Sequence, residues 1–199
     1  MTLDTDYQSL ATAGETLRRY LSETVRFKRR LKLLLPQGYH YQGGEDYVLE
    51  RGGLATSQAL TAEEKALVVR VMEQCPEKRF PVGHCYRNAQ VLVACDKSET
   101  LHYCEGWAMG LVGIPTLHGW VSINDKVVDL TWRTVKPGRG RMGNRVWGVI
   151  PPGWAYYGAL FPNNAVRSRI IRLKSTGPFL DDVEHGFPLF KEPRLHALT

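Results

Sequence analysis

The sequence predicts an α+β fold in a single domain spanning residues 1–199. Helical spacing of apolar residues dominates the first half of the chain, strand-like segments follow Asp96, and the dipeptide Asn124-Asp125 joins two of them as a tight turn. Helices followed by an antiparallel meander are typical of an α+β domain and not of a doubly wound parallel sheet. With 199 residues and 43% hydrophobic content, the chain can build one core.

The first predicted helix covers residues 10–35 and carries a basic face. Its apolar residues recur at near-helical spacing until Pro36-Gln37-Gly38 ends the run. Seven cations between Arg18 and Lys32 face the single acid Glu23, and they supply much of the net charge of +6. The simplest interpretation is a solvated helix that packs one side on the domain. The alternative is a surface for nucleic acid or an acidic protein.

The remaining elements follow from local signals. Residues 38–59 are predicted to form a loop with one short strand. A capping box at Thr61 and Glu64 begins a helix that Pro76 closes after Gln74, which leaves Cys75 in the core or at the helix end. The predicted catalytic core is 61–174, with a third helix that has Cys85 in its first turn, strands over 101–108, 117–123, 126–132 and 145–150, and an irregular tail over 175–199.

Cys85 differs from Cys75, Cys95 and Cys104 because of its place at the start of a helix. A thiol nucleophile must be ionised, and an unassisted cysteine with a pKa near 8.5 is mostly protonated at neutral pH. The helix N-terminus offers partial positive charge and free amides, which stabilise a thiolate and can hold the oxyanion of an acyl intermediate. A small buried hydrophobe is the ordinary role of a cysteine, and metal ligation is the third alternative.

An imidazole and a carboxylate are expected on the strand pair that follows. A two-residue loop at Asn124-Asp125 pairs Ile123 with Lys126, which puts His118 opposite Thr131 and diagonal to Asp129 on one face. Asp129 would then fix the tautomer of His118 that faces the thiol. A three-residue loop would separate the two side chains. The competing interpretations are a core histidine satisfied by a carbonyl, and an aspartate that holds a turn.

These segments resemble the transglutaminase-like branch of the papain-like cysteine enzymes. Gly83-His84-Cys85-Tyr86 is similar to the start of the catalytic helix in that family, His118-Gly119-Trp120-Val121 to its H-A-W-V strand, and Val128-Asp129-Leu130-Thr131 to its V-D-P-T. Gly119 and Leu130 depart from the usual alanine and proline. The resemblance spans a quarter of the chain, and it implies a catalytic helix packed on an antiparallel sheet and Cys-His-Asp catalysis of amide or acyl chemistry, in an uncharacterised bacterial or phage branch.

Four further residues are candidates for substrate binding. Tyr103 and Glu105 precede His118 on a strand and could line the cleft, although Tyr103 is also a natural core residue. Trp120 shares the face of His118 and would exclude water, and Asn88 lies one turn from Cys85. A basic loop, Lys136 to Arg145, could receive an acidic substrate beside the cleft.

The sequence therefore predicts a cysteine hydrolase or acyltransferase that acts on an amide or isopeptide bond of a peptide or protein and needs no cofactor. No metal is expected, because the four cysteines lack the close spacing of zinc ligands. A cytoplasmic location without a membrane is expected, because no apolar run approaches about 18 residues and the N-terminus is acidic. The alternatives are a non-catalytic module that binds nucleic acid or an acidic protein through the basic helix, and acyl transfer from a small thioester.

Overall fold

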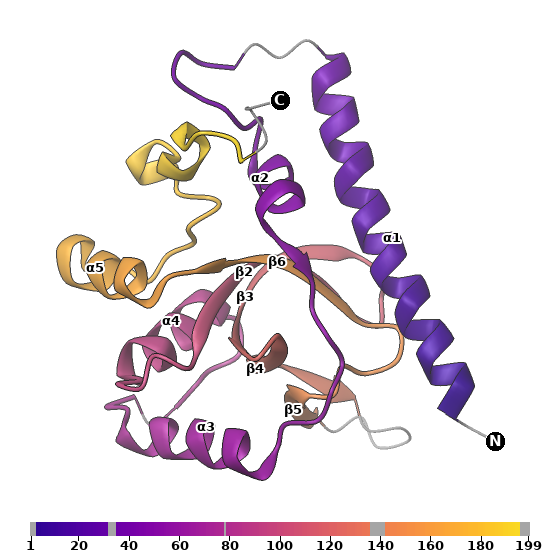
Figure 1. Cartoon of the computed structure of the whole chain (residues 1–199), viewed down its shortest axis with the longest axis vertical. Helices are drawn as coiled ribbons and strands as arrows, with labels where there is room; N and C mark the ends of the chain where they lie inside the picture. Colours follow the sequence, from indigo (N-terminus) through magenta and orange to yellow (C-terminus); the bar gives the residue numbers. More distant parts are fainter. Residues whose placement is uncertain (1–2, 32–34, 78, 136–141, 196–199) are drawn as a thin grey trace.

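The computed structural model describes residues 3–31, 35–77, 79–135 and 142–195, which form an α+β domain (Figure 1). A six-stranded antiparallel sheet has the order β1-β6-β2-β3-β4-β5, with helices packed on it. The elements are α1 (Leu3–Arg30), α2 (Gly44–Arg51), β1 (Gly53–Leu54), α3 (Ala62–Gln74), α4 (Cys85–Cys95), β2 (His102–Met109), β3 (Pro115–Ile123), β4 (Lys126–Val135), β5 (Met142–Gly148), β6 (Ala155–Phe161), α5 (Asn163–Leu173), and the short 3-10 helices η1 (Val183–His185) and η2 (Pro188–Lys191).

The meander of four strands from β2 to β5 confirms the predicted antiparallel arrangement. Asn124 and Asp125 both have positive φ, as a two-residue hairpin turn requires, and Ile123 pairs with Lys126. Strand β6 was not expected from the sequence, and neither was α5. Because β6 returns to pair with β2, the first strand of the meander becomes an interior strand of the sheet.

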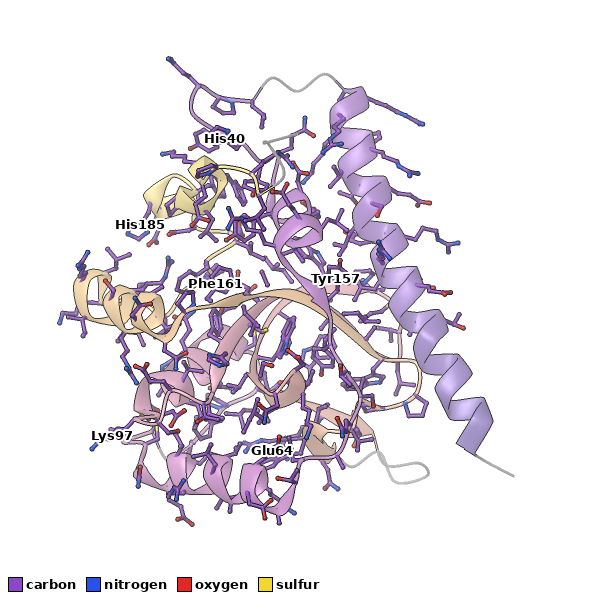
Figure 2. All side chains as sticks on the ribbon, viewed as in Figure 1. His40, Glu64, Lys97, Tyr157, Phe161 and His185 are labelled. Atoms are coloured by element: carbon purple, nitrogen blue, oxygen red, sulfur yellow. The ribbon has the colours of Figure 1, made fainter. Side chains whose placement is uncertain are left out.

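The main apolar cluster lies between the helices and one face of the sheet. Leu17 and Leu21 of α1 and Leu92 of α4 are fully buried in it, together with strand residues such as Tyr157 and Phe161 of β6. Figure 2 shows these two labelled rings at the level of β6, near the centre of the molecule. A second, smaller cluster occupies the other face and includes Cys104, Ala108, Trp120, Val127, Trp154 and Tyr156.

Helix α1 differs in its limits from the predicted helix over 10–35. It begins at Leu3 and ends at Arg30, and Leu31 and Leu35 are exposed instead of continuing the apolar face. Lys28 and Arg29 form ion pairs with Glu45 and Asp46 of α2, at 2.6 and 3.2 Å. These pairs attach the C-terminal end of α1 to the domain. Lys32 lies outside the described residues.

The loop predicted for residues 38–59 is wrong over its middle, where α2 forms. The helix is only eight residues long, so it shows no sustained apolar period, and glycines flank it. Acidic residues in its first turn and Arg51 in its last turn match the helix dipole. Tyr47 and Val48 are buried, so packing against the sheet stabilises a helix that is too short to stand alone.

Helix α3 confirms the capping box, since Thr61 accepts from the amide of Glu64 and Glu64 accepts from the amide of Thr61. The Glu64 carboxylate also accepts from Nζ of Lys126 at 2.8 Å and from Nδ2 of Asn124. One buried side chain, labelled in Figure 2, thereby ties the start of α3 to the β3–β4 turn. Cys75 is buried at the end of α3, as predicted.

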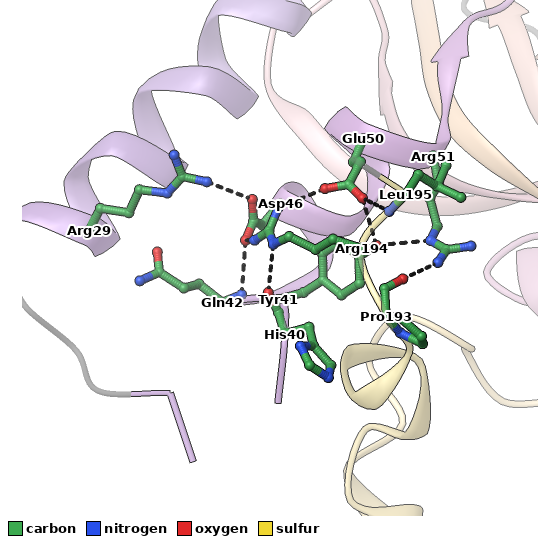
Figure 3. Close-up of polar contacts among 10 residues, drawn as sticks. All are labelled: Arg29, His40, Tyr41, Gln42, Asp46, Glu50, Arg51, Pro193, Arg194 and Leu195. Atoms are coloured by element: carbon green, nitrogen blue, oxygen red, sulfur yellow. Dashed lines mark hydrogen bonds and ion pairs between the residues drawn. The ribbon is translucent and has the colours of Figure 1, made fainter. Parts of the chain in front are cut away.

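The C-terminal segment after Ser175 is mostly irregular, as expected, but it is held firmly. Arg194 pairs with Asp46 and Glu50 of α2, and Arg51 donates to the carbonyl oxygen of Pro193 (Figure 3). Near the start of the segment, the amides of Phe179 and Leu180 donate to the buried carboxylate of Glu105 in β2. The segment is therefore part of the folded domain. Among the described helices, none combines the length and the apolar content needed to cross a bilayer.

Candidate active site

Cys85 is the first residue of α4, which confirms its predicted place at a helix N-terminus. The preceding residue, His84, gives no side-chain cap to the helix, so the positive end of the helix is open to the sulfur. The backbone amides of Tyr86 and Gly119 lie close enough to the thiol to lower its pKa, and the side chain is only partly buried. The sulfur is thus surrounded by donors and still accessible.

His118 and Asp129 form the expected pair. Nε2 of His118 lies 2.8 Å from Oδ2 of Asp129, and both side chains are buried. Cys85 lies close enough to His118 that each side chain shifts the pKa of the other. Because Nε2 is engaged by the carboxylate, Nδ1 is the ring nitrogen left to face the sulfur. The three residues therefore meet in one site, in the order thiol, imidazole, carboxylate.

A gap between β3 and β4 makes this meeting possible. The two strands pair from the turn only as far as Val121 and Val128, so the pairing predicted between His118 and Thr131 does not form. Oδ1 of Asp129 instead accepts from the amides of Thr131 and Trp132, at 2.8 and 3.0 Å. These amides find a partner in a side chain and not in the neighbouring strand. The amide of Gly119 lies beyond the β3–β4 pairing and near the Cys85 sulfur, whose pKa it lowers.

The charges of the site favour a thiolate beside an imidazolium. Burial alone would raise the pKa of Cys85, but the hydrogen bond and the charge of His118 outweigh it, together with the amides of Gly119 and Tyr86, so the pKa lies below its ordinary value. Burial alone would lower the pKa of His118, yet the charge and the hydrogen bond of Asp129 raise it to about 9. These opposite shifts favour transfer of the thiol proton to the imidazole.

Three aromatic rings lie around the imidazole. The Trp132 ring centroid lies 4.6 Å from that of His118, and the rings of Trp120 and Tyr156 lie within 6.4 Å. The Tyr156 hydroxyl donates to Oδ2 of Asp129 at 2.9 Å. Sequence reasoning missed this tyrosine because β6 itself was not recognised. The run of small, aromatic and aliphatic residues over 155–161, without a charge, was the available signal.

The four predicted substrate-binding residues are all in the interior. Tyr103 and Glu105 are fully buried, and Trp120 and Asn88 are each 2% exposed. The Glu105 carboxylate accepts from the Tyr103 hydroxyl at 2.6 Å and from the amides of Phe179 and Leu180. Burial raises the pKa of Glu105 to about 7 despite these three donors.

Asn88 has a structural contact beside the thiol. Its Nδ2 donates to the carbonyl oxygen of Pro81 and to Oγ1 of Thr131, at 2.8 and 3.0 Å, and so connects α4 to β4. None of the four predicted residues presents a surface to solvent. Their role in substrate binding stays a prediction without geometric support.

Tyr86 and Gly119 are further residues that the sequence did not single out for function. A Cβ at position 119 would lie 2.9 Å from Cδ1 of Tyr86 and 3.1 Å from the Tyr103 hydroxyl. The glycine that departs from the family's usual alanine is therefore required by the packing of Tyr86, the residue next to the nucleophile. The departure is a local adjustment of shape.

The other cysteines lie in different environments. Burial raises the pKa of Cys104, and burial with the neighbouring Cys75 raises that of Cys95 to about 12. The sulfurs of Cys75 and Cys95 lie 2.9 Å apart as free thiols. Among the described residues, no three histidine, cysteine or acidic side chains are grouped as metal ligands would be. Comparison of the chain with protein-family models, with curated proteins and with solved structures finds no match.

Proposed function

We propose that the protein is a cysteine hydrolase or acyltransferase that acts on an amide or isopeptide bond of a peptide or protein. The observation that carries the proposal is the convergence of Cys85, His118 and Asp129, with opposite pKa shifts of the thiol and the imidazole. Paired groups whose environments push their pKa values in these directions are characteristic of nucleophile and base.

In the proposed reaction the Cys85 thiolate attacks the carbonyl carbon of the substrate. First-turn amides of α4, which have no partner within the helix, are suitable donors for the oxyanion. The His118 imidazolium gives its proton to the leaving amine as the C–N bond breaks, which leaves a thioester on Cys85. Neutral His118 then takes a proton from water or from an acceptor amine, and the second attack releases the acyl group and restores the thiol. Asp129 holds the ring orientation throughout.

The test uses covalent trapping. A small activated ester, p-nitrophenyl acetate, should release nitrophenol in a burst and leave one acetyl group on the peptide that contains Cys85, found by mass spectrometry. Cys85→Ala should abolish the burst, and Cys104→Ala should keep it, since Cys104 is buried. Acetylation spread evenly over all four cysteines, or a burst that survives in Cys85→Ala, would count decisively against the proposal. Release of the acetyl group to water or to added amine then separates hydrolysis from transfer.

The alternative function, binding of nucleic acid or an acidic protein through α1, has narrower support. Arg18, Arg19, Arg26 and Arg30 are exposed on this helix, but Lys28 and Arg29 pair with α2. Salt-sensitive retention on a nucleic-acid column that survives Cys85→Ala and is lost on neutralising Arg19, Arg26 and Arg30 would favour it.

A further inference from the structure

A groove with three cations lies between the start of α3 and the hairpin of β4 and β5. Its volume is about 740 Å³. Lys65 lines it from α3, Arg133 from β4 and Arg145 from β5, and Asn144 and Trp147 complete its wall. The exposed Lys65 and Arg133 face solvent, and Arg145 is partly buried. Among the described residues that line this groove, none is acidic.

The two arginines are directly opposite each other across the paired strands. Opposite residues of an antiparallel pair share a face, and like charges in that position are destabilising. In the part of the chain that the structure describes, none of the three cations has an ion pair with a carboxylate, and Nε of Arg145 is buried without a partner. The structure therefore keeps a repulsive pair that an anion would neutralise, and it leaves a donor open.

The groove is connected directly to the candidate nucleophile. Arg145 donates to the carbonyl oxygen of Phe80, and its guanidinium lies over the Phe80 ring. Five residues later the chain reaches Cys85. On β4, the buried Thr131 is bonded to Asn88, one helical turn from Cys85, and Arg133 lies two residues beyond Thr131, about 7 Å from it at ordinary strand spacing.

We infer that Lys65, Arg133 and Arg145 form a subsite for an anionic group of the acyl substrate, either a carboxylate or a phosphate. Guanidinium groups bind both oxyanions through paired N–H donors. The inference rests on the proposed function and adds a substrate class to it: the acyl substrate that Cys85 attacks carries a negative group. Of the basic loop predicted from sequence, this subsite uses Arg145. Residues 136–141 lie outside the described residues.

The first test compares matched electrophiles that label Cys85. The probes are iodoacetyl-glutamate and iodoacetyl-phosphoserine, each with an amidated carboxyl end, and their neutral counterparts with glutamine and serine. Attack by the thiolate displaces iodide and forms a thioether, and mass spectrometry gives the labelling rate of each cysteine. We expect the anionic member of at least one pair to label Cys85 about fivefold faster, a preference that added salt reduces. The pair that shows the preference identifies the group as carboxylate or phosphate.

Variants assign the preference to the groove. Arg133→Gln with Arg145→Gln should reduce the rate ratio to below about twofold. Arg145→Gln also removes the contact of Arg145 with Phe80. Arg133→Gln and Lys65→Gln, at exposed positions, are therefore also made as single variants that keep this contact, and each should lower the rate ratio. Arg70→Gln, an exposed change elsewhere on α3, should leave the ratio unchanged. Equal rates within both pairs in the unmodified protein, or a preference that persists in the double variant, would overturn the inference.

A second readout does not depend on catalysis. Inorganic phosphate and acetate are titrated separately into Cys85→Ala and followed through the indole N–H signal of Trp147, and at least one of them should give a saturable shift that Arg133→Gln weakens. Absence of a saturable shift with both anions would refute the subsite. Failure of the proposed function is recognised separately, because Cys85 would then react with the neutral probes no faster than Cys75, Cys95 or Cys104.

Discussion

Replacing the triad carboxylate tests the electrostatic basis of the site most directly. Asp129→Asn preserves the shape of the side chain, and the amide oxygen can still accept from the backbone of Thr131 and Trp132. The new NH₂ group would then face Nε2 of His118, which must become an acceptor. The proton would move to Nδ1, and the ring would present N–H, instead of a lone pair, towards Cys85. The variant should fold and yet hold the wrong tautomer.

The size of the effect follows from the pKa of His118. Raising it from 6.5 to about 9 corresponds to about 3 kcal/mol in favour of the imidazolium, at about 1.4 kcal/mol per pKa unit. Without the negative charge of Asp129, that pKa falls towards its ordinary value or below it, because burial acts alone. The thiolate loses its counterion, and the pKa of Cys85 rises. At pH 6.5 we expect alkylation of Cys85 to slow at least about tenfold.

The assay is the second-order rate of Cys85 alkylation by iodoacetamide between pH 5 and 10, resolved by peptide mass spectrometry. In the unmodified protein the rate should rise as pH passes the lowered pKa of the thiol and change again near pH 9, where His118 loses its proton and the pair ends. In Asp129→Asn one transition should remain, at a higher pH than the first transition of the unmodified protein. Superimposable profiles for the two proteins would refute the electrostatic reasoning, and circular dichroism checks that the variant is folded.

Three other changes test the surroundings of the site. Tyr156→Phe removes a donor to the triad carboxylate and should lower the free energy of unfolding by about 2 kcal/mol, measured by urea denaturation; an unchanged midpoint would contradict this role. Gly119→Ala forces Tyr86 to shift and should slow alkylation of the adjacent thiol at least about threefold, whereas an unchanged rate would mean that the ring moves freely. Lys126→Met leaves the Glu64 carboxylate without its cation and should cost on the order of 2 kcal/mol in thermal unfolding, and equal stability would show that Asn124 and water suffice.

The local elements of the fold could be predicted where the sequence carries a strong helix-cap or turn signal. Thr61 with Glu64 specified the start of α3, and Asn124-Asp125 specified the hairpin register on which the argument for His118 and Asp129 depended. The α+β class and the meander followed from these. The more specific prediction of a transglutaminase-like core stays a prediction, because the structure establishes only the α+β class.

The elements that depend on contacts between residues far apart in the chain could not be predicted from the sequence. Helix α2 is stabilised by packing of Tyr47 and Val48 and not by its own period, and β6 is defined by its pairing with β2. The substrate-binding prediction for Glu105 overlooked residues 179 and 180, which donate to its carboxylate from 74 and 75 positions along the chain. The sequence also did not predict that β3–β4 pairing ends at Val121 and Val128. Beyond that point the amide of Thr131 donates to the Asp129 carboxylate and not to a carbonyl oxygen of β3.

The return of β6 to β2 has a consequence for the order of events during biosynthesis. The ribosome delivers α4 and β2 to β5 first, so β2 emerges with an open edge that is a template for wrong association until residues 155–161 arrive. Tyr156, which completes the bonding of the Asp129 carboxylate, is on that late strand. A nascent chain stalled before residues 155–161 would contain Cys85 but lack the Tyr156 hydroxyl that donates to Asp129. The candidate site is therefore complete only after the last strand has been translated.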